Sequence, residues 1–108
     1  MVEQFSVERL TSEAMEKTQE ILFLLARNEP EQGLERARAM DAWWDEEAPN
    51  AEMIINHVAT DDVRFTLSRL IAALEMGDRD DAFVYANELE GNIEHVLERQ
   101  ELSWQNLL

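Results

Sequence analysis

The residues with the clearest potential for chemistry form a polar row at three- and four-residue spacing: His57, Asp61, Arg64 and Ser68. On a helix, side chains at this spacing can reach one another. A carboxylate one turn from a histidine orients an imidazole as a general base or as a metal ligand. The same row can equally be a satisfied polar seam that sets helix register at the edge of a core.

The sequence lacks the other groups that a catalytic role for this row would require. The nucleophile would have to be Ser68 or Thr60, and no glycine-rich loop or oxyanion hole accompanies either residue. The absence of cysteine removes thiol nucleophiles, thiolate metal sites and disulfides. We therefore expect a structural row, no enzymatic activity and no cofactor.

Metal ligation has weak candidates in His57, Asp61 and His95. Carboxylate-bridged di-iron bundles use Glu-x-x-His pairs, but Ile54 and Asn92 stand three residues before the two histidines. We therefore expect no metal site, and ligand binding at the polar row stays the alternative function.

The elements that position these residues follow from hydrophobic periodicity. Apolar residues recur at three- and four-residue steps along four segments, without the alternation typical of strands. The sequence predicts an all-α, up-down-up-down four-helix bundle that forms one domain over residues 1–108. The predicted helices cover about residues 6–27, 30–47, 50–76 and 78–100, followed by a docked tail at 101–108.

Capping and turn residues set these boundaries. Ser6, Asn50 and Asp78 can each cap the start of a helix. Asn28 and Gly77 are residues that adopt the left-handed conformation at helix ends. A further expected end is Pro49, because proline disrupts a helix interior, whereas Pro30 suits a first turn.

The two halves of the chain align at an offset of 49 residues. The matched positions are Ile21 with Leu70, Leu25 with Leu74, Ala37 with Ala86, Met40 with Leu89 and Trp44 with Ile93. A helical hairpin cannot bury its apolar face alone, so two stacked hairpins make a sensible minimal core. This pseudo-repeat is either a duplication or an equivalence that any two amphipathic hairpins would show.

The third helix is apolar on two opposite faces. The second face comprises Ile54, Val58, Phe65 and Ala72, and the first comprises Met53, Asn56, Thr60, Val63, Leu67, Leu70, Ile71 and Leu74. We expect such a helix to contact neighbours on two sides.

The charge of the chain restricts its partners. There are 24 acidic residues against nine basic ones, for a formal net charge of −15. A surface this negative repels phosphate, so we expect neither nucleic acid nor an anionic membrane as a partner. The sequence has no segment of membrane-span or signal-peptide character, and we expect a cytoplasmic protein.

Three groups of residues offer a surface to a protein partner. Neighbouring tryptophans on a helix point about 100° apart, so Trp43 is expected exposed, or flat on another helix, if Trp44 is buried. An acidic run follows them, as a docking patch or a solvated face. The apolar tail should dock on its own bundle or on a second subunit, since free tails are normally polar. The predicted interaction surface comprises Trp43, Asp45, Glu46, Glu47, Trp104, Leu107 and Leu108.

The order of these features resembles an uncharacterised family of short bacterial helical proteins, known only as a domain of unknown function. The matching features are a tryptophan near the end of the second helix, His57-x-x-x-Asp61, Leu67-Ser68-Arg69-Leu70, Gly77-Asp78 with Ala82, and Asn106-Leu107-Leu108. The resemblance covers the chain from about Leu22 onward. Members often carry an N-terminal membrane anchor, a segment not seen in this sequence, so the resemblance implies a location outside the membrane as the alternative to the cytoplasm. It implies no activity.

Together these patterns predict a non-enzymatic helical bundle that acts by protein–protein contact or self-association. The expected partner is another protein or a second copy of the chain, as in a dimer. The alternative is a bundle that binds a metal or a small ligand at His57 and Asp61.

Overall fold

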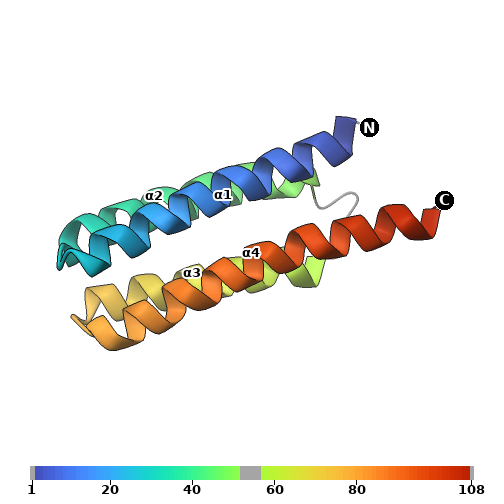
Figure 1. Ribbon diagram of the computed structural model, residues 1–108. Helices are drawn as coiled ribbons and strands as arrows, with labels where there is room; N and C mark the ends of the chain where they lie inside the picture. The colour runs from blue at the N-terminus through green and yellow to red at the C-terminus, as the bar shows by residue number, and fades with distance from the viewer. Residues whose placement is uncertain (1, 52–56, 108) are drawn as a thin grey trace.

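A computed structural model describes the backbone of residues 2–51 and 57–107 and the side chains of residues 7–50 and 57–102. This part of the chain forms four α-helices and contains no strand (Figure 1). The helices are α1 (Val2–Ala26), α2 (Pro30–Ala51), α3 (His57–Glu75) and α4 (Arg79–Leu107). The predicted all-α, four-helix class is confirmed.

The four helices lie side by side in an elongated bundle. In Figure 1 consecutive helices run in opposite directions, both tight turns lie at one end, and the two chain termini lie at the other. Each helix packs on its neighbours in sequence, and α1 also packs on α4. The bundle is therefore a closed ring with four seams: α1/α2, α2/α3, α3/α4 and α1/α4.

The two tight turns are built alike, 49 residues apart. Asn28 and Gly77 both take the left-handed conformation, with φ of 61° and 75°. In each turn the N–H of the following residue donates to the carbonyl five residues back, at 2.9 Å, which is the bond of a Schellman cap. Asp78 then caps α4 as predicted, because its Oδ1 accepts from the Asp81 N–H at 3.0 Å.

Buried apolar side chains from all four helices form one core. Positions matched at the 49-residue offset are buried in both hairpins: Ile21 and Leu70, Leu25 and Leu74, Ala37 and Ala86, Met40 and Leu89, and Trp44 and Ile93. Superposition of the two hairpins stays a prediction.

Two expected helix starts were wrong. The first helix begins at Val2, so Ser6 lies inside α1 and not at its cap. The second helix continues through Pro49 to Ala51, so Asn50 belongs to α2 and does not cap α3. The part of the predicted third helix before His57 includes Met53 and Ile54, which lie outside the described residues.

The continuation of α2 past Pro49 has a tertiary cause. Pro49 lies in the last turn, where its missing N–H removes a single hydrogen bond. Ala48 and Trp44, in the same stretch, are fully buried in the core. Burial of these side chains favours the helical conformation by more than the lost bond disfavours it.

The predicted tail is part of a helix. Residues 101–107 continue α4 without interruption, so no separate docked segment follows residue 100. Leu102 is 55% exposed and therefore does not dock on its own chain. The side chains of Trp104, Leu107 and Leu108 lie outside the described part, and their docking stays a prediction.

The second apolar face of α3 does not contact another helix of the same chain, contrary to what its pattern suggested for the bundle. Val58 is 58% exposed and Phe65 is 54% exposed, and Ala72 is exposed as well. In a ring of four helices, α3 packs on α2 and α4, and the first apolar face fills the core between them. The second face is left on the outside.

Candidate functional site

The polar row on α3 is centred on Arg64. Its Nη1 donates to Oδ1 of Asp61 at 2.6 Å, and its Nε donates to Oδ1 of Asp45 on α2 at 3.1 Å. The Ser68 hydroxyl donates to the Arg64 carbonyl at 3.2 Å. Arg64 therefore pairs with one acid on its own helix and one on α2, and the row ties the α2/α3 seam together.

Further polar contacts at and beside this seam are made to backbone carbonyls. Trp44 Nε1 donates to the Thr60 carbonyl at 3.3 Å, and the Thr60 hydroxyl donates to the His57 carbonyl at 3.0 Å. The pKa of Asp41 is raised by burial and by the nearby Asp45 carboxylate, an effect that Arg64 partly opposes. At this seam the two arginines, Arg64 and Arg38, are both engaged by carboxylates.

The three metal-ligand candidates do not converge. Arg99 Nε donates to Nε2 of His95 at 3.2 Å, and His95 Nδ1 lies 3.8 Å from a Glu98 oxygen. Asp61 is paired with Arg64. Across residues 7–50 and 57–102, no three His, Cys, Asp or Glu side chains are grouped so that they could hold a metal ion.

Trp43 is not the exposed contact residue predicted first. Its ring is half-buried against the core, and the Lys17 ammonium of α1 lies 4.9 Å from the ring centroid. This matches the alternative, a tryptophan lying against a neighbouring helix. In the adjacent acidic run Asp45, Glu46 and Glu47 are exposed, and Asp45 is engaged by Arg64.

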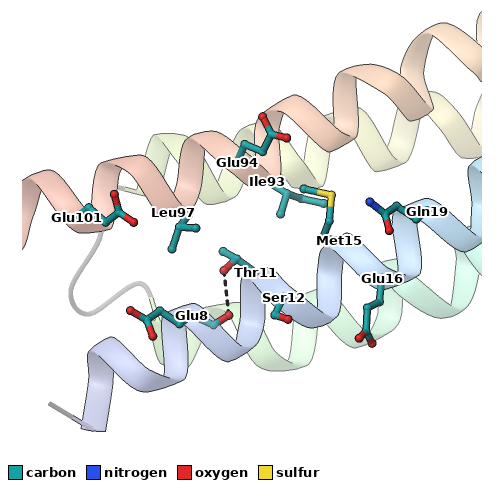
Figure 2. Close-up of a pocket in the computed structure, with 10 residues that line it drawn as sticks. All are labelled: Glu8, Thr11, Ser12, Met15, Glu16, Gln19, Ile93, Glu94, Leu97 and Glu101. Carbon is teal, nitrogen blue, oxygen red and sulfur yellow. Dashed lines mark hydrogen bonds between the residues drawn. The ribbon is translucent and has the colours of Figure 1, made fainter.

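A groove of about 420 Å³ lies between α1 and α4, and sequence patterns did not reveal it (Figure 2). Its floor is mainly apolar and comprises Thr11, Met15, Ile93 and Leu97. Its rim carries four glutamates, Glu8, Glu16, Glu94 and Glu101, together with Ser12 and Gln19. Among the described side chains, no basic one lines this groove.

Antiparallel packing of α1 on α4 assembles this rim. Figure 2 shows Glu8 and Glu101 at one end of the groove, and Glu16 and Gln19 towards the other. Each helix supplies one edge at three- and four-residue spacing, as any amphipathic helix does at the border of its apolar face. The residues that meet are more than 70 positions apart, so periodicity alone could not pair them.

The α1/α4 seam also differs from the other three in its ion pairs. Ion pairs between helices occur at α1/α2 (Arg36–Glu20), at α2/α3 (Arg64–Asp45 and Arg38–Glu75) and at α3/α4 (Arg69–Glu88). Between the described side chains of α1 and α4 there is none. A concave apolar surface edged by like charges concentrates negative potential. The groove is therefore suited to a ligand that is both apolar and cationic.

A family model described as a domain of unknown function, DUF4363, matches residues 1–107. The chain belongs to the DUF4363 family. The uncharacterised family inferred from sequence motifs is thus confirmed, and membership brings no activity, ligand or partner. No curated protein and no solved structure matches the chain.

For this DUF4363 chain, none of the helices, as far as they are described, combines the length and apolarity that crossing a membrane requires. The cytoplasmic location expected from the sequence stays a prediction.

Proposed function

We propose that this DUF4363 protein is a non-enzymatic helical bundle that acts by protein–protein contact, and that its α1/α4 groove receives a basic amphipathic helix of a partner. The observation that carries the proposal is an apolar floor framed by four glutamates, with no basic residue among the described residues that line the groove. The chain has fifteen more acidic residues than basic ones, so a basic partner is also favoured at long range.

The dimensions of the groove suit a helix. Glu8 and Gln19 are eleven residues apart on α1, which corresponds to about 16 Å, or three helical turns. An amphipathic helix of that length can place three or four apolar side chains on the floor. Lysines or arginines that flank its apolar face would then lie beside the glutamates of both edges.

The residues that line the groove are suited to binding a ligand rather than to catalysing a reaction. Its polar groups are carboxylates, two hydroxyls and an amide, a set that lacks a histidine or lysine base to activate Thr11 or Ser12. Ligand binding at His57 and Asp61, the alternative from the sequence, has less support because Asp61 and Arg64 neutralise each other at 2.6 Å.

The test is titration of the full chain with a synthetic leucine- and lysine-rich amphipathic helix, measured by calorimetry. Replacement of all four rim glutamates by glutamine (E8Q, E16Q, E94Q and E101Q) should weaken binding about tenfold or more. The matched control replaces four exposed glutamates of α2 (E31Q, E35Q, E46Q and E47Q), which changes net charge equally.

The control variant should retain affinity to within about threefold, since it loses only long-range attraction. A second variant, Leu97→Asp, removes apolar contact from the floor and should also weaken binding. Equal losses in the rim and control variants would show that the peptide binds by net charge alone, and the proposed groove function would be wrong.

A further inference from the structure

The outer face of α3 carries an apolar stripe that is exposed on the outside of the four-helix ring. Val58, Phe65 and Ala72 follow one another at seven-residue spacing, and all three are exposed, Val58 and Phe65 by more than half. Single exposed apolar residues are normal on protein surfaces. Three on one line of a helix form the kind of seam through which helices pair.

The same helix is the least acidic of the four. Its described span holds three acidic and two basic residues, a net charge of −1, whereas α4 holds seven acidic and two basic residues, a net charge of −5. By the same count α1 carries −3 and α2 carries −4. A second copy of a chain with net charge −15 is therefore repelled least at α3.

The pattern is also self-complementary in one arrangement. Val58 and Ala72 each lie seven residues from Phe65, so an antiparallel pair of α3 helices centred on Phe65 brings each Val58 opposite an Ala72. An interface between two identical copies with two-fold symmetry requires this relation, in which residue i meets j and j meets i.

Charged residues on one flank of α3 are also complementary between two antiparallel copies. Arg69 approaches Glu88 of α4, and the Asp62 carbonyl accepts from Asn92 of α4, so Asp62 and Arg69 share the flank next to α4. Like flanks meet in an antiparallel pair. Asp62 lies three residues before Phe65 and Arg69 four residues after it, so each Arg69 would face Asp62 of the second copy.

We propose that α3 is a self-association surface, at which two copies of the chain pair antiparallel about a two-fold axis at Phe65. This surface is separate from the α1/α4 groove and does not rest on the proposed function. The span from Val58 to Ala72 is about 21 Å, and one helix pair of that length covers less than the roughly 1,200 Å² of a stable interface. The dimer is therefore transient and forms at high protein concentration.

The first test is sedimentation equilibrium up to about 1 mM protein at low and high salt. Dimer should increase with concentration and also with salt, because salt screens the repulsion between two strongly acidic chains. Phe65→Asp should abolish it. Phe23→Asp is the matched control, since Phe23 is 59% exposed on α1 and away from the stripe, and it should dimerise as the wild type does.

The second test reverses charges. Asp62→Arg and Arg69→Asp should each weaken the dimer, because each places like charges across the two-fold axis, and the double variant should restore it. A general effect of net charge would instead move the two single variants in opposite directions. Thermal unfolding of each variant serves as the check that the fold is retained.

Cross-linking tests the geometry, because the natural chain has no cysteine. Under oxidation Phe65→Cys should form a disulfide dimer with itself, and Val58→Cys should cross-link to Ala72→Cys in a mixture but not to itself. A wild-type chain that stays monomeric at every concentration and salt, an unaffected F65D variant, or self-cross-linking of V58C would each overturn the proposal.

Discussion

The two opposite seams of the bundle, α2/α3 and α1/α4, use their charges in contrasting ways. At α2/α3, Arg64 contacts both Asp61 and Asp45, and Arg38 Nη2 lies 2.6 Å from Oε2 of Glu75. At α1/α4, four glutamates edge a groove whose described lining residues include no basic one. One seam satisfies its carboxylates internally, and the other leaves them for a cation from outside.

The buried polar groups near these two seams also differ, because one is hydrogen-bonded and the other is not. Trp44 fills the core beside α3, and its ring N–H is satisfied by the Thr60 carbonyl. Gln100, on the last described turns of α4, is fully buried, and neither amide atom has a hydrogen-bond partner among the residues that the structure describes. A buried amide without partners lowers the free energy of unfolding.

The largest expected effect is the loss of the Trp44 side chain. Trp44→Ala should lower the free energy of unfolding by about 3–5 kcal/mol, because a fully buried indole and its hydrogen bond are removed. Trp43→Ala is the control and should cost clearly less, since that ring is only half-buried. Urea unfolding measures both, and equal losses would contradict the assignment of Trp44 as the buried member of the pair.

Replacement of the buried Gln100 amide should stabilise the fold, whereas loss of Trp44 should destabilise it. Gln100→Leu should raise the free energy of unfolding by about 1–3 kcal/mol, because an unsatisfied polar group is exchanged for an apolar one of similar size. Gln32→Leu, at an exposed position of α2, should stay within about 0.5 kcal/mol of the natural chain. A destabilised Q100L variant would mean that the Gln100 amide does have a partner.

Neutralisation of single charges should change stability in opposite directions at the two seams. Arg64→Ala should lower stability by about 0.5–1.5 kcal/mol, since a partly buried guanidinium with two carboxylate partners is lost. Glu94→Gln and Glu101→Gln at the groove should instead raise the thermal midpoint slightly, because like charges no longer face each other. Destabilisation by either glutamine would show that the groove carboxylates have favourable contacts within the chain.

The smallest expected effect is a pH dependence from Asp41. Because burial raises its pKa in the folded state, Asp41 favours folding while it is protonated in acid, and this contribution is lost as the pH rises through the raised folded pKa. Asp41→Asn should therefore be relatively more stable at neutral pH, by less than about 1 kcal/mol for this partly exposed group. Unfolding measured from acidic to neutral pH checks this, and an unchanged profile would count against it.

Much of the fold could be predicted because it depends on local conformation. Asn28 and Gly77 mark helix ends by their tolerance of positive φ, and both adopt it. The three- and four-residue periodicity identified Trp44 and the first face of α3 as core. These signals lie within one or two helical turns, so no knowledge of the neighbouring helix was needed.

The errors arose where tertiary packing outweighs a local preference. Pro49 indicates a helix end, but burial of Ala48 keeps the last turn of α2 helical. The second apolar stripe of α3 indicates a second neighbour, but a closed ring of four helices provides none on that side. Periodicity reports that a face is apolar and says nothing of what covers it.

The sequence by itself determined the four helices, the two tight turns at Asn28 and Gly77, the core faces and the polar row on α3, since each depends on residues close together in the chain. Only the tertiary structure decided that Arg64 reaches Asp45 on α2 and that Glu8 and Glu101 share one end of a groove. The physical reason is that side-chain pairing between helices is set by which faces the helices bury against each other.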